Sequence, residues 1–240
     1  MSGVLTVIPA RLASTRFPGK VLARLQGRTL VEWCWRAAQA AKLGPVLVAV
    51  DSRRVADEVR RFGGEAVMTP PSCPSGSDRV WLAAKNHREA VILNYQGDMP
   101  LLKAATLRAT VKALTRGTDI ATAVIPVAGK RAHDPNVVKA VLAADGRCLY
   151  FSRAAVPYSR DASPVRRWEH LGLYAYRREA LKRFVSLPPS PLEETEKLEQ
   201  LRAIEAGMTM RAAVVAERPV AVDAPADLRR AERLLRRENP

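Results

Sequence analysis

Apolar and polar positions follow one another along the first half of the chain in blocks that predict alternating strands and helices. Apolar runs of strand length occupy residues 4–8, 46–50, 65–68 and 90–95. Between them, apolar residues recur at helical spacing over 30–41 and 53–62, and we expect a further helix over 78–86. This order is typical of right-handed βαβ units that build a largely parallel sheet.

Residues that favour helix ends support these boundaries. Thr29 and Glu32 have the spacing of a capping box at the start of the first helix, and Asp51–Ser52 predicts the cap of the second. A second capping box, Ser190 with Glu193, predicts a helix that continues to Gly207, and Asp223–Pro225 predicts a last helix to about Arg237.

The spacing of apolar residues changes after a helix expected over 101–116, from an alternation of helices and strands to a succession of strands. Strand-like runs then follow at 119–127, 137–142, 148–151, 170–176, 210–215 and 220–222. Residues 144–147 predict a hairpin turn, and residues 158–168 have no period and predict a flexible segment. We therefore expect one α/β domain over residues 1–240, with an inserted antiparallel excursion roughly over 119–177.

Composition narrows the class of protein. Hydrophobic residues make up 48% of the chain, yet no apolar run has the length of a membrane helix, and we see no signal peptide. Three scattered cysteines indicate reduced thiols in a cytoplasm. The net charge of +15 is compatible with a nucleic-acid binder, a steering field for an anionic substrate, or a merely arginine-rich composition. With 5% aromatic residues and no nucleic-acid-binding motif, we expect no nucleic acid partner.

The stretch from Val7 to Lys20 carries the strongest chemical signal. It follows the first predicted strand and holds Arg11, Arg16 and Lys20, with Ser14 and Thr15 between them. Cations and hydroxyls at a strand end suit a polyphosphate, because ligands of open α/β sheets lie beyond the carboxyl ends of the strands. The alternative is a solvated basic turn.

Two carboxylates also follow predicted strands. Asp98 stands beside Gly97 and suits Mg²⁺, which prefers one or two carboxylates together with phosphate oxygens. Asp223 is a second candidate ligand, and its alternative is a plain helix cap. Spacing alone does not bring the two residues together.

Three further groups have open alternatives. Ser75, Gly76 and Arg79 lie at a predicted helix start, where backbone N–H groups could meet a base edge and the arginine a phosphate. His170 and Tyr174 share one face of a strand and could form one side of a sugar-binding site. The alternative is a half-buried histidine that binds no ligand. Glu199 and Gln200 would be an ordinary solvated face of a helix.

Motifs of other enzyme classes are missing from the sequence. It has no G-x-G-x-x-G, no Walker loop and no G-x-S-x-G, and no cysteine has an evident histidine partner. Catalysis by a protein nucleophile therefore has no candidate.

Taken in order, the motifs resemble those of the 3-deoxy-manno-octulosonate (Kdo) cytidylyltransferases. The matching elements are Ile8–Lys20, Ser75–Arg79, Asn94–Pro100, Asp134–Lys139, Leu149–Ala154, His170–Arg177, Ser190–Arg202 and Ala221–Leu228. They span nearly the whole chain, and the first and sixth are specific to that family.

The resemblance implies a Rossmann-like nucleotide-diphospho-sugar transferase fold that converts CTP and Kdo into CMP-Kdo and pyrophosphate, for lipopolysaccharide precursor synthesis. It implies a homodimer with Mg²⁺ held by Asp98 and Asp223. Lys20, Arg16 and Asp98 would be catalytic. The nucleotide would be held by Arg11, Ser14, Arg16, Lys20, Ser75, Gly76 and Arg79, and the sugar acid by Gln96, His170, Tyr174, Glu199 and Gln200.

Three departures from the family pattern leave the acceptor open. Met99 stands where the family has glutamate, the usual lead-in to Asp223 is altered, and the segment before His170 is short. A cytidylyltransferase for another acidic keto-sugar, of the nonulosonic acid type, is the alternative, and a basic nucleic-acid-binding protein is a distant one.

Overall fold

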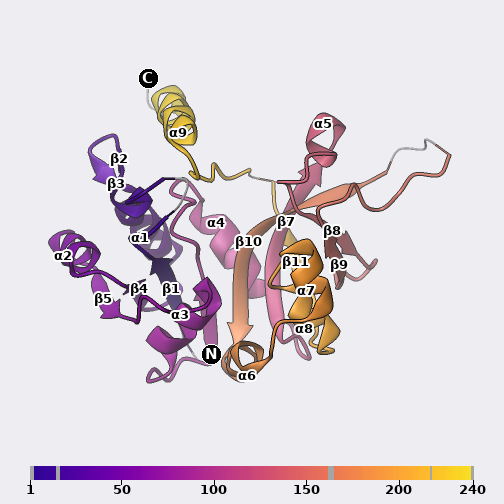
Figure 1. The fold of residues 1–240 in the computed structure, drawn as a ribbon, viewed down its shortest axis with the longest axis horizontal. Helices are drawn as coiled ribbons and strands as arrows, with labels where there is room; N and C mark the ends of the chain where they lie inside the picture. The colour runs from indigo at the N-terminus through magenta and orange to yellow at the C-terminus, as the bar shows by residue number, and fades with distance from the viewer. Residues whose placement is uncertain (1–2, 15–16, 162–164, 217, 239–240) are drawn as a thin grey trace. The chain divides into compact units, whose positions relative to one another are not determined.

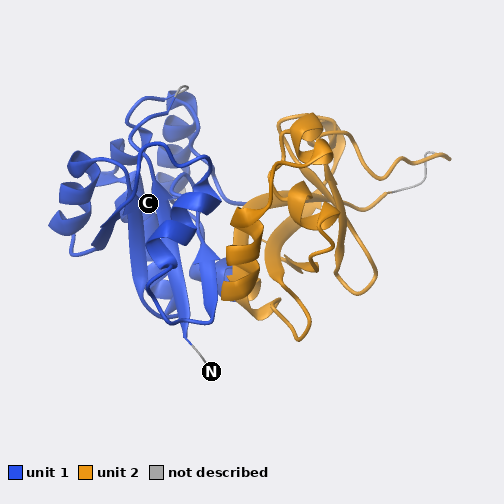
Figure 2. Ribbon diagram, turned by 60° about the horizontal axis from the view of Figure 1, so that its bottom comes forward, with its two compact units in different colours: residues 1–108, 218–240 blue, residues 109–217 orange. Residues whose placement is uncertain are grey.

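The computed structural model describes residues 3–14, 17–161, 165–216 and 218–238. The chain divides into two compact units, coloured separately in Figure 2. Unit 1 comprises residues 1–108 and 218–240, and unit 2 comprises residues 109–217. The antiparallel excursion expected over 119–177 lies in unit 2, which continues beyond it to residue 217.

Four parallel strands form the sheet of unit 1 (Figure 1), in the order β6-β1-β4-β5. They are β1 (Val4–Ala10), β4 (Val46–Val50), β5 (Glu65–Met68) and β6 (Val91–Asn94). All five residues of β4 are buried, as expected of a central strand covered on both faces. The predicted parallel sheet is confirmed.

Three helices connect these strands and pack on the sheet. They are α1 (Leu30–Ala41), α2 (Arg53–Arg61) and α3 (Gly76–Ala84). Right-handed crossovers between the strands in this order place α1 and α2 on one face and α3 on the other. Thr29 caps α1 as predicted, accepting the Glu32 N–H, while the Glu32 carboxylate pairs with Arg36.

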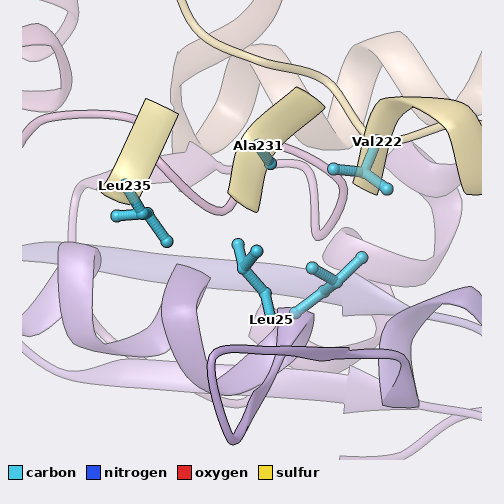
Figure 3. Packing of buried hydrophobic residues seen from close by; sticks show 5 residues of the cluster. Leu25, Val222, Ala231 and Leu235 are labelled. Carbon is cyan, nitrogen blue, oxygen red and sulfur yellow. The ribbon is translucent and has the colours of Figure 1, made fainter. Parts of the chain in front are cut away.

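The C-terminal helix α9 (Pro225–Glu238) packs on a hairpin near the start of unit 1. That hairpin joins β2 (Arg24–Leu25) to β3 (Arg28–Thr29) and follows the short 3₁₀ helix η1 (Lys20–Leu22). Figure 3 shows Ala231 and Leu235 of α9 facing Leu25. Val222, just before α9, is fully buried in the same cluster and holds the start of this helix in place.

The sheet of unit 2 is mostly antiparallel, in the order β11-β7-β10-β8-β9, with β11 parallel to β7. Its strands are β7 (Ile120–Val127), β8 (Lys139–Leu142), β9 (Cys148–Ser152), β10 (Arg167–Arg177) and β11 (Met210–Val214). Helix α4 (Ala104–Lys112) crosses the boundary between the units and is shorter than the predicted 101–116. The short helix α5 (Gly129–Ala132) follows β7.

The helices and strands differ from the sequence predictions at three further points. Helix α6 (Arg178–Ser186) was not predicted. The helix predicted from Ser190 to Gly207 is two helices, α7 (Pro191–Glu196) and α8 (Leu201–Glu205), because Lys197 takes a left-handed conformation that ends α7. The predicted strand at Val220–Val222 is not part of any sheet.

The segment expected to be flexible, 158–168, includes residues 162–164, which lie outside the described residues. Its end, from Arg167, belongs to β10. None of the helices formed by the described residues combines the length and the apolar character needed to cross a bilayer.

Candidate active site

A polar pocket of about 370 Å³ lies in unit 1, beyond the carboxyl ends of β1 and β6. It gathers nearly all of the predicted site residues of that unit. The residues among its lining that the sequence singled out are Arg11, Ser14, Lys20, Ser75, Gly76, Arg79, Gln96, Asp98 and Asp223. Thr15 and Arg16 lie outside the described residues, so the role expected for Arg16 stays a prediction.

The close approach of two strand ends forms the floor of this pocket. A Cβ atom on Gly97 would lie 3.0 Å from the carbonyl oxygen of Pro9, so a larger residue would push the ends of β1 and β6 apart. Gln96, next to it, donates to the Asn94 side chain over 2.9 Å. A glycine at this position therefore lets Asp98 come close to the loop after β1.

Lys20 joins the two predicted metal ligands. Its Nζ lies 3.1 Å from Oδ2 of Asp98 and 2.9 Å from Oδ1 of Asp223. Burial by itself lowers the pKa of Lys20, but the two carboxylates outweigh it and raise the pKa above its ordinary value. The structure thus brings both carboxylates to one cation, which spacing alone could not establish.

The backbone around Asp223 is fixed by contacts that the sequence did not reveal. The Val222 N–H donates to the carbonyl of Asp98 over 2.8 Å, and this bond ties the two carboxylate-bearing segments together. The Asp227 carboxylate accepts the N–H groups of Asp223 and Ala224 at 3.1 and 2.9 Å. Asp227 therefore caps α9, and the Asp223 side chain is available to Lys20 instead.

Ser75 is the N-cap of α3, at the edge of the pocket. Its hydroxyl oxygen accepts the N–H groups of Ser77 and Asp78 and donates to the Asp78 carboxylate. Those two N–H groups are therefore already bonded, which removes two of the donors proposed for a base edge. Gly76 remains at the pocket wall.

The guanidinium of Arg79 is almost completely buried, with 4% of its side chain exposed. It lies 3.3 Å from the Asp51 carboxylate and donates to the Thr69 hydroxyl over 2.6 Å. Of the pair Asp51–Ser52 that predicted the cap of α2, Ser52 takes the N-cap position, while the Asp51 carboxylate accepts the Leu12 N–H over 2.9 Å.

The remaining predicted residues lie in unit 2, where His170 and Tyr174 belong to an aromatic cluster. The rings of His170 and Tyr174 are 5.3 Å apart, and the ring of Phe151 meets His170 edge-on at 4.9 Å. Gly172 has a φ of +66°, and the pairing of β10 with β7 shifts between His170 and Tyr174. The positive φ at this bulge favours a glycine. Despite the shift in pairing, the rings of His170 and Tyr174 remain in contact.

His170 is neutral. Burial lowers its pKa to about 3. Its Nε2 lies 2.8 Å from the Thr122 hydroxyl, which gives its single proton to the carbonyl of Leu173 over 2.7 Å. His170 must then donate through Nε2, and its Nδ1 carries a lone pair that can accept a hydroxyl.

Glu199 and Gln200 lie at the break between α7 and α8 and not on a continuous helix face. Burial raises the pKa of Tyr174, and the negative charge of Glu199 raises it further. Glu199 is therefore close enough to influence the tyrosine electrostatically. Gln200 is 5% exposed, which contradicts a solvated position.

A network that the sequence did not indicate holds this break against β9. Glu196, at the end of α7, accepts from the Ser152 hydroxyl at 2.6 Å and from the Arg153 N–H at 2.9 Å. Nearby, the fully buried Lys139 donates to the carbonyl oxygen of Asp134 over 2.9 Å. In the sequence, these residues were marked only as members of the family motifs at 134–139, 149–154 and 190–202, without a role.

Comparison with known proteins gives consistent results. The family model for cytidylyltransferases matches residues 5–210. A 3-deoxy-manno-octulosonate cytidylyltransferase of Parvibaculum lavamentivorans is 51% identical, covering 98% of this chain and 93% of the relative. Another, from Elusimicrobium minutum, is 44% identical, covering 98% and 99%. A solved structure of CMP:2-keto-3-deoxy-manno-octonic acid synthetase complexed with CTP superposes with a TM-score of 0.95 at 35% identity, covering 99% of this chain and 100% of that one.

Proposed function

Because this chain belongs to the 3-deoxy-manno-octulosonate cytidylyltransferase family, we infer that it transfers CMP from CTP to the anomeric hydroxyl of Kdo and releases pyrophosphate. The observation that carries this function is the convergence of Lys20, Asp98 and Asp223 in one polar pocket. The similar solved structure holds CTP, which is the nucleotide that we assign to this pocket.

The reaction needs positioning and charge neutralisation more than a protein nucleophile. The hydroxyl of the sugar attacks the α-phosphorus of CTP in line, and pyrophosphate leaves. The pocket residues that the structure describes include no histidine that could activate a nucleophile. We assign the triphosphate to Arg11, Ser14 and Lys20, whose cations and hydroxyl line the pocket, and the charge on the leaving pyrophosphate to Lys20.

The carboxylate pair fits a divalent cation. Asp98 and Asp223 already meet around one positive charge, the ammonium of Lys20. Across the described residues no group of three or more acidic, histidine or cysteine side chains gathers, so phosphate oxygens would complete the coordination, as is usual for Mg²⁺. When bound there, Mg²⁺ would neutralise phosphate charge and make the attacking hydroxyl more acidic. Lys20 would then turn from the carboxylates to the phosphates.

Unit 2 supplies the groups that we assign to the sugar acid. The neutral His170 can accept a hydroxyl at Nδ1, and Tyr174 keeps its proton because its pKa is raised. Glu199 and Gln200 add an acceptor and an amide. Gln96, in unit 1, lines the nucleotide pocket.

Met99, one of the three departures that left the acceptor open, does not line the pocket. Its side chain belongs to the core, at 4% exposure, and its carbonyl accepts the Tyr95 hydroxyl over 2.6 Å. The methionine is thus accommodated by burial, and the assignment of Kdo as the acceptor rests on the family of the chain.

We also propose that the enzyme works as a homodimer in the cytoplasm, in lipopolysaccharide precursor synthesis. The three cysteines are free, and burial raises the pKa of Cys34 and of Cys148 to about 12, which suits thiols that stay reduced. The mass of the purified protein in solution tests the dimer.

A pyrophosphate-release assay tests the function. Purified protein with CTP and Mg²⁺ is offered Kdo and, separately, a nonulosonic acid. We expect release with Kdo and much less with the nonulosonic acid. No release with Kdo would refute the proposed function, and preferential use of the nonulosonic acid would replace Kdo as the acceptor.

A further inference from the structure

A buried ion pair stands behind the loop that follows β1. Asp51, just after β4, and Arg79, in α3, place their charged groups 3.3 Å apart, with 8% and 4% of the two side chains exposed. Arg79 has a second hydrogen bond. Its guanidinium donates to the Thr69 hydroxyl, and that hydroxyl donates to the carbonyl of Val50 over 2.9 Å. The pair is therefore fixed to the ends of β4 and β5.

The second oxygen of Asp51 reaches the loop. Oδ1 accepts the N–H of Leu12 over 2.9 Å, while Oδ2 faces Arg79. Leu12 lies between Arg11 and Ser14, which line the nucleotide pocket. A buried carboxylate that accepts a backbone N–H makes one of the stronger hydrogen bonds in proteins.

The same residue, Leu12, also connects this anchor to Lys20. The carbonyl of Leu12 accepts the N–H of Gly19, and Gly19 is the N-cap of η1, which begins at Lys20. One carboxylate therefore fixes both the Arg11–Ser14 side of the loop and the start of the helix that carries the catalytic lysine.

Charge explains why Arg79 is needed. An isolated carboxylate beside a triphosphate loop would repel the substrate, and its burial without a partner would be costly. Arg79 cancels that charge and orients the carboxylate, so that one oxygen remains for the Leu12 N–H.

We propose that Asp51 is a positioning residue that, held by Arg79, fixes Leu12 and Gly19, on the two sides of the triphosphate-binding loop, before CTP arrives. The proposal rests on the assignment of this pocket to CTP. Backbone that is already fixed at these two residues loses less conformational entropy when the ligand binds, so removing the anchor weakens CTP binding and leaves the chemical step nearly unchanged.

The test compares two double variants that both lack the ion pair. Asp51→Asn/Arg79→Met keeps an oxygen that can accept the Leu12 N–H, and Asp51→Leu/Arg79→Met has a side chain of similar size without one. Any direct contact between Arg79 and CTP is lost in both. Neither variant leaves an unpaired buried charge, so both are expected to fold.

Calorimetric titration with CTP, without sugar, is the first measurement. We expect the Leu variant to bind CTP about tenfold more weakly than the Asn variant. This is the expected effect of losing one hydrogen bond between uncharged groups, together with the ordering of the backbone at Leu12 that the bond provides. At saturating CTP the two kcat values should differ by less than about threefold, a KM-against-kcat split that a merely structural defect would not give. Equal affinities would overturn the proposal.

Hydrogen exchange of the Leu12 amide is the second measurement, and it needs no substrate. In the unaltered protein this amide should exchange far more slowly than that of exposed Ala13, and the protection should be lost in the Leu variant. Equal exchange of the two amides in the unaltered protein would overturn the anchor even if a variant failed to fold. Absence of pyrophosphate release by the unaltered enzyme would instead contradict the proposed function, so the two failures are distinguishable.

Discussion

The two units carry their candidate site residues in opposite electrostatic states. In unit 1, a lysine and two carboxylates meet within hydrogen-bond distance and stay partly open to solvent, with 13%, 31% and 37% of the side chains exposed. In unit 2, an aromatic cluster surrounds a histidine that burial keeps neutral. Unit 1 is therefore suited to phosphates and metal, and unit 2 to hydroxyl groups.

The physical origin of this difference is the number of charged partners. Lys20 is partly buried, yet its two carboxylates raise its pKa, so it remains a firm cation. For His170 no charged partner among the described residues offsets burial, and its pKa falls to about 3. Burial beside two carboxylates thus leaves a charged group in one unit, and deeper burial without such partners leaves a neutral one in the other.

The largest expected effect is on the charged side of this comparison. Asp98→Asn removes a proposed metal ligand and half of the negative charge around Lys20, but no core side chain. We expect kcat to fall about a thousandfold, the loss of roughly 4 kcal/mol of transition-state stabilisation. Pyrophosphate release measures it.

Asp57→Asn is the matched control, because Asp57 is an exposed carboxylate in the same unit that pairs with Arg60. An exposed pair contributes little, so its activity should stay within about twofold of the unaltered enzyme. Full activity of Asp98→Asn would discard the metal assignment.

The next effect tests the neutral side. His170→Phe keeps a ring against Phe151 and Tyr174 and removes both nitrogens. We expect KM for Kdo to rise about tenfold, from the loss of one hydrogen bond, and KM for CTP to stay unchanged. Steady-state kinetics with each substrate varied measure both constants.

The control is His133→Phe, an exposed histidine of unit 2, which should leave both constants unchanged. If His170→Phe changed KM for CTP as much as KM for Kdo, the division of substrates between the units would be wrong.

A smaller effect concerns metal binding without nucleotide. Lys20 occupies the space between the two carboxylates, so a metal ion has to displace it. Lys20→Met should bind Mn²⁺ about five- to tenfold more tightly in the absence of CTP, although turnover falls, because a competing cation is gone.

Calorimetric titration with Mn²⁺ gives the affinity, and Lys85→Met, at the exposed end of α3, serves as control. Unchanged or weaker metal binding by Lys20→Met would show that the carboxylates do not hold the ion.

The smallest effect is on stability against pH. The folded-state pKa of His170 lies near 3, below its ordinary value of 6.5, so the unfolded chain takes up the proton first as pH falls. The stability that neutral His170 provides is complete above pH 6.5 and is lost progressively from there toward pH 3.

Denaturant unfolding at pH 7 and pH 5 measures this loss. The unaltered protein should lose about 1 kcal/mol more than His170→Phe between the two pH values, after allowance for solvent around the half-buried ring. His133→Phe should behave as the unaltered protein does. Identical pH dependence of the unaltered protein and His170→Phe would contradict the neutral histidine.

The sequence predicted unit 1 well because its site residues follow buried strands. Parallel strands place their carboxyl ends at one edge, so Asp98 and the loop with Arg11 and Lys20 could be grouped from order alone. Asp51 also follows a buried strand, but its spacing before α2 equally suits a helix cap, and the bond to Leu12 joins residues that no local pattern relates.

Unit 2 was less predictable because tertiary contacts decide its local structure. Nothing in the local spacing around Lys197 predicts a left-handed residue, yet it ends α7 and moves Glu199 and Gln200 out of a helix. The alternation that placed His170 and Tyr174 on one face ignored the bulge at Gly172, which the structure accommodates without separating the rings. Glu196 was not assigned a role because its partners, Ser152 and Arg153, lie far along the chain. Lys139 was not assigned one because it donates to backbone carbonyls, which no side-chain pattern marks.

The hydrogen bond from Val222 to the carbonyl of Asp98 has a consequence for synthesis on the ribosome. The strands of unit 1 all lie within the first 108 residues, but Asp98 gains its partner carboxylate only when Asp223 has left the exit tunnel. Packing of Ala231 and Leu235 on Leu25 then fixes the segment. A nascent or truncated chain that stops before Val222 has the strands of unit 1 but lacks the second carboxylate, so the pair of carboxylates around Lys20 cannot form before Asp223 has been synthesised.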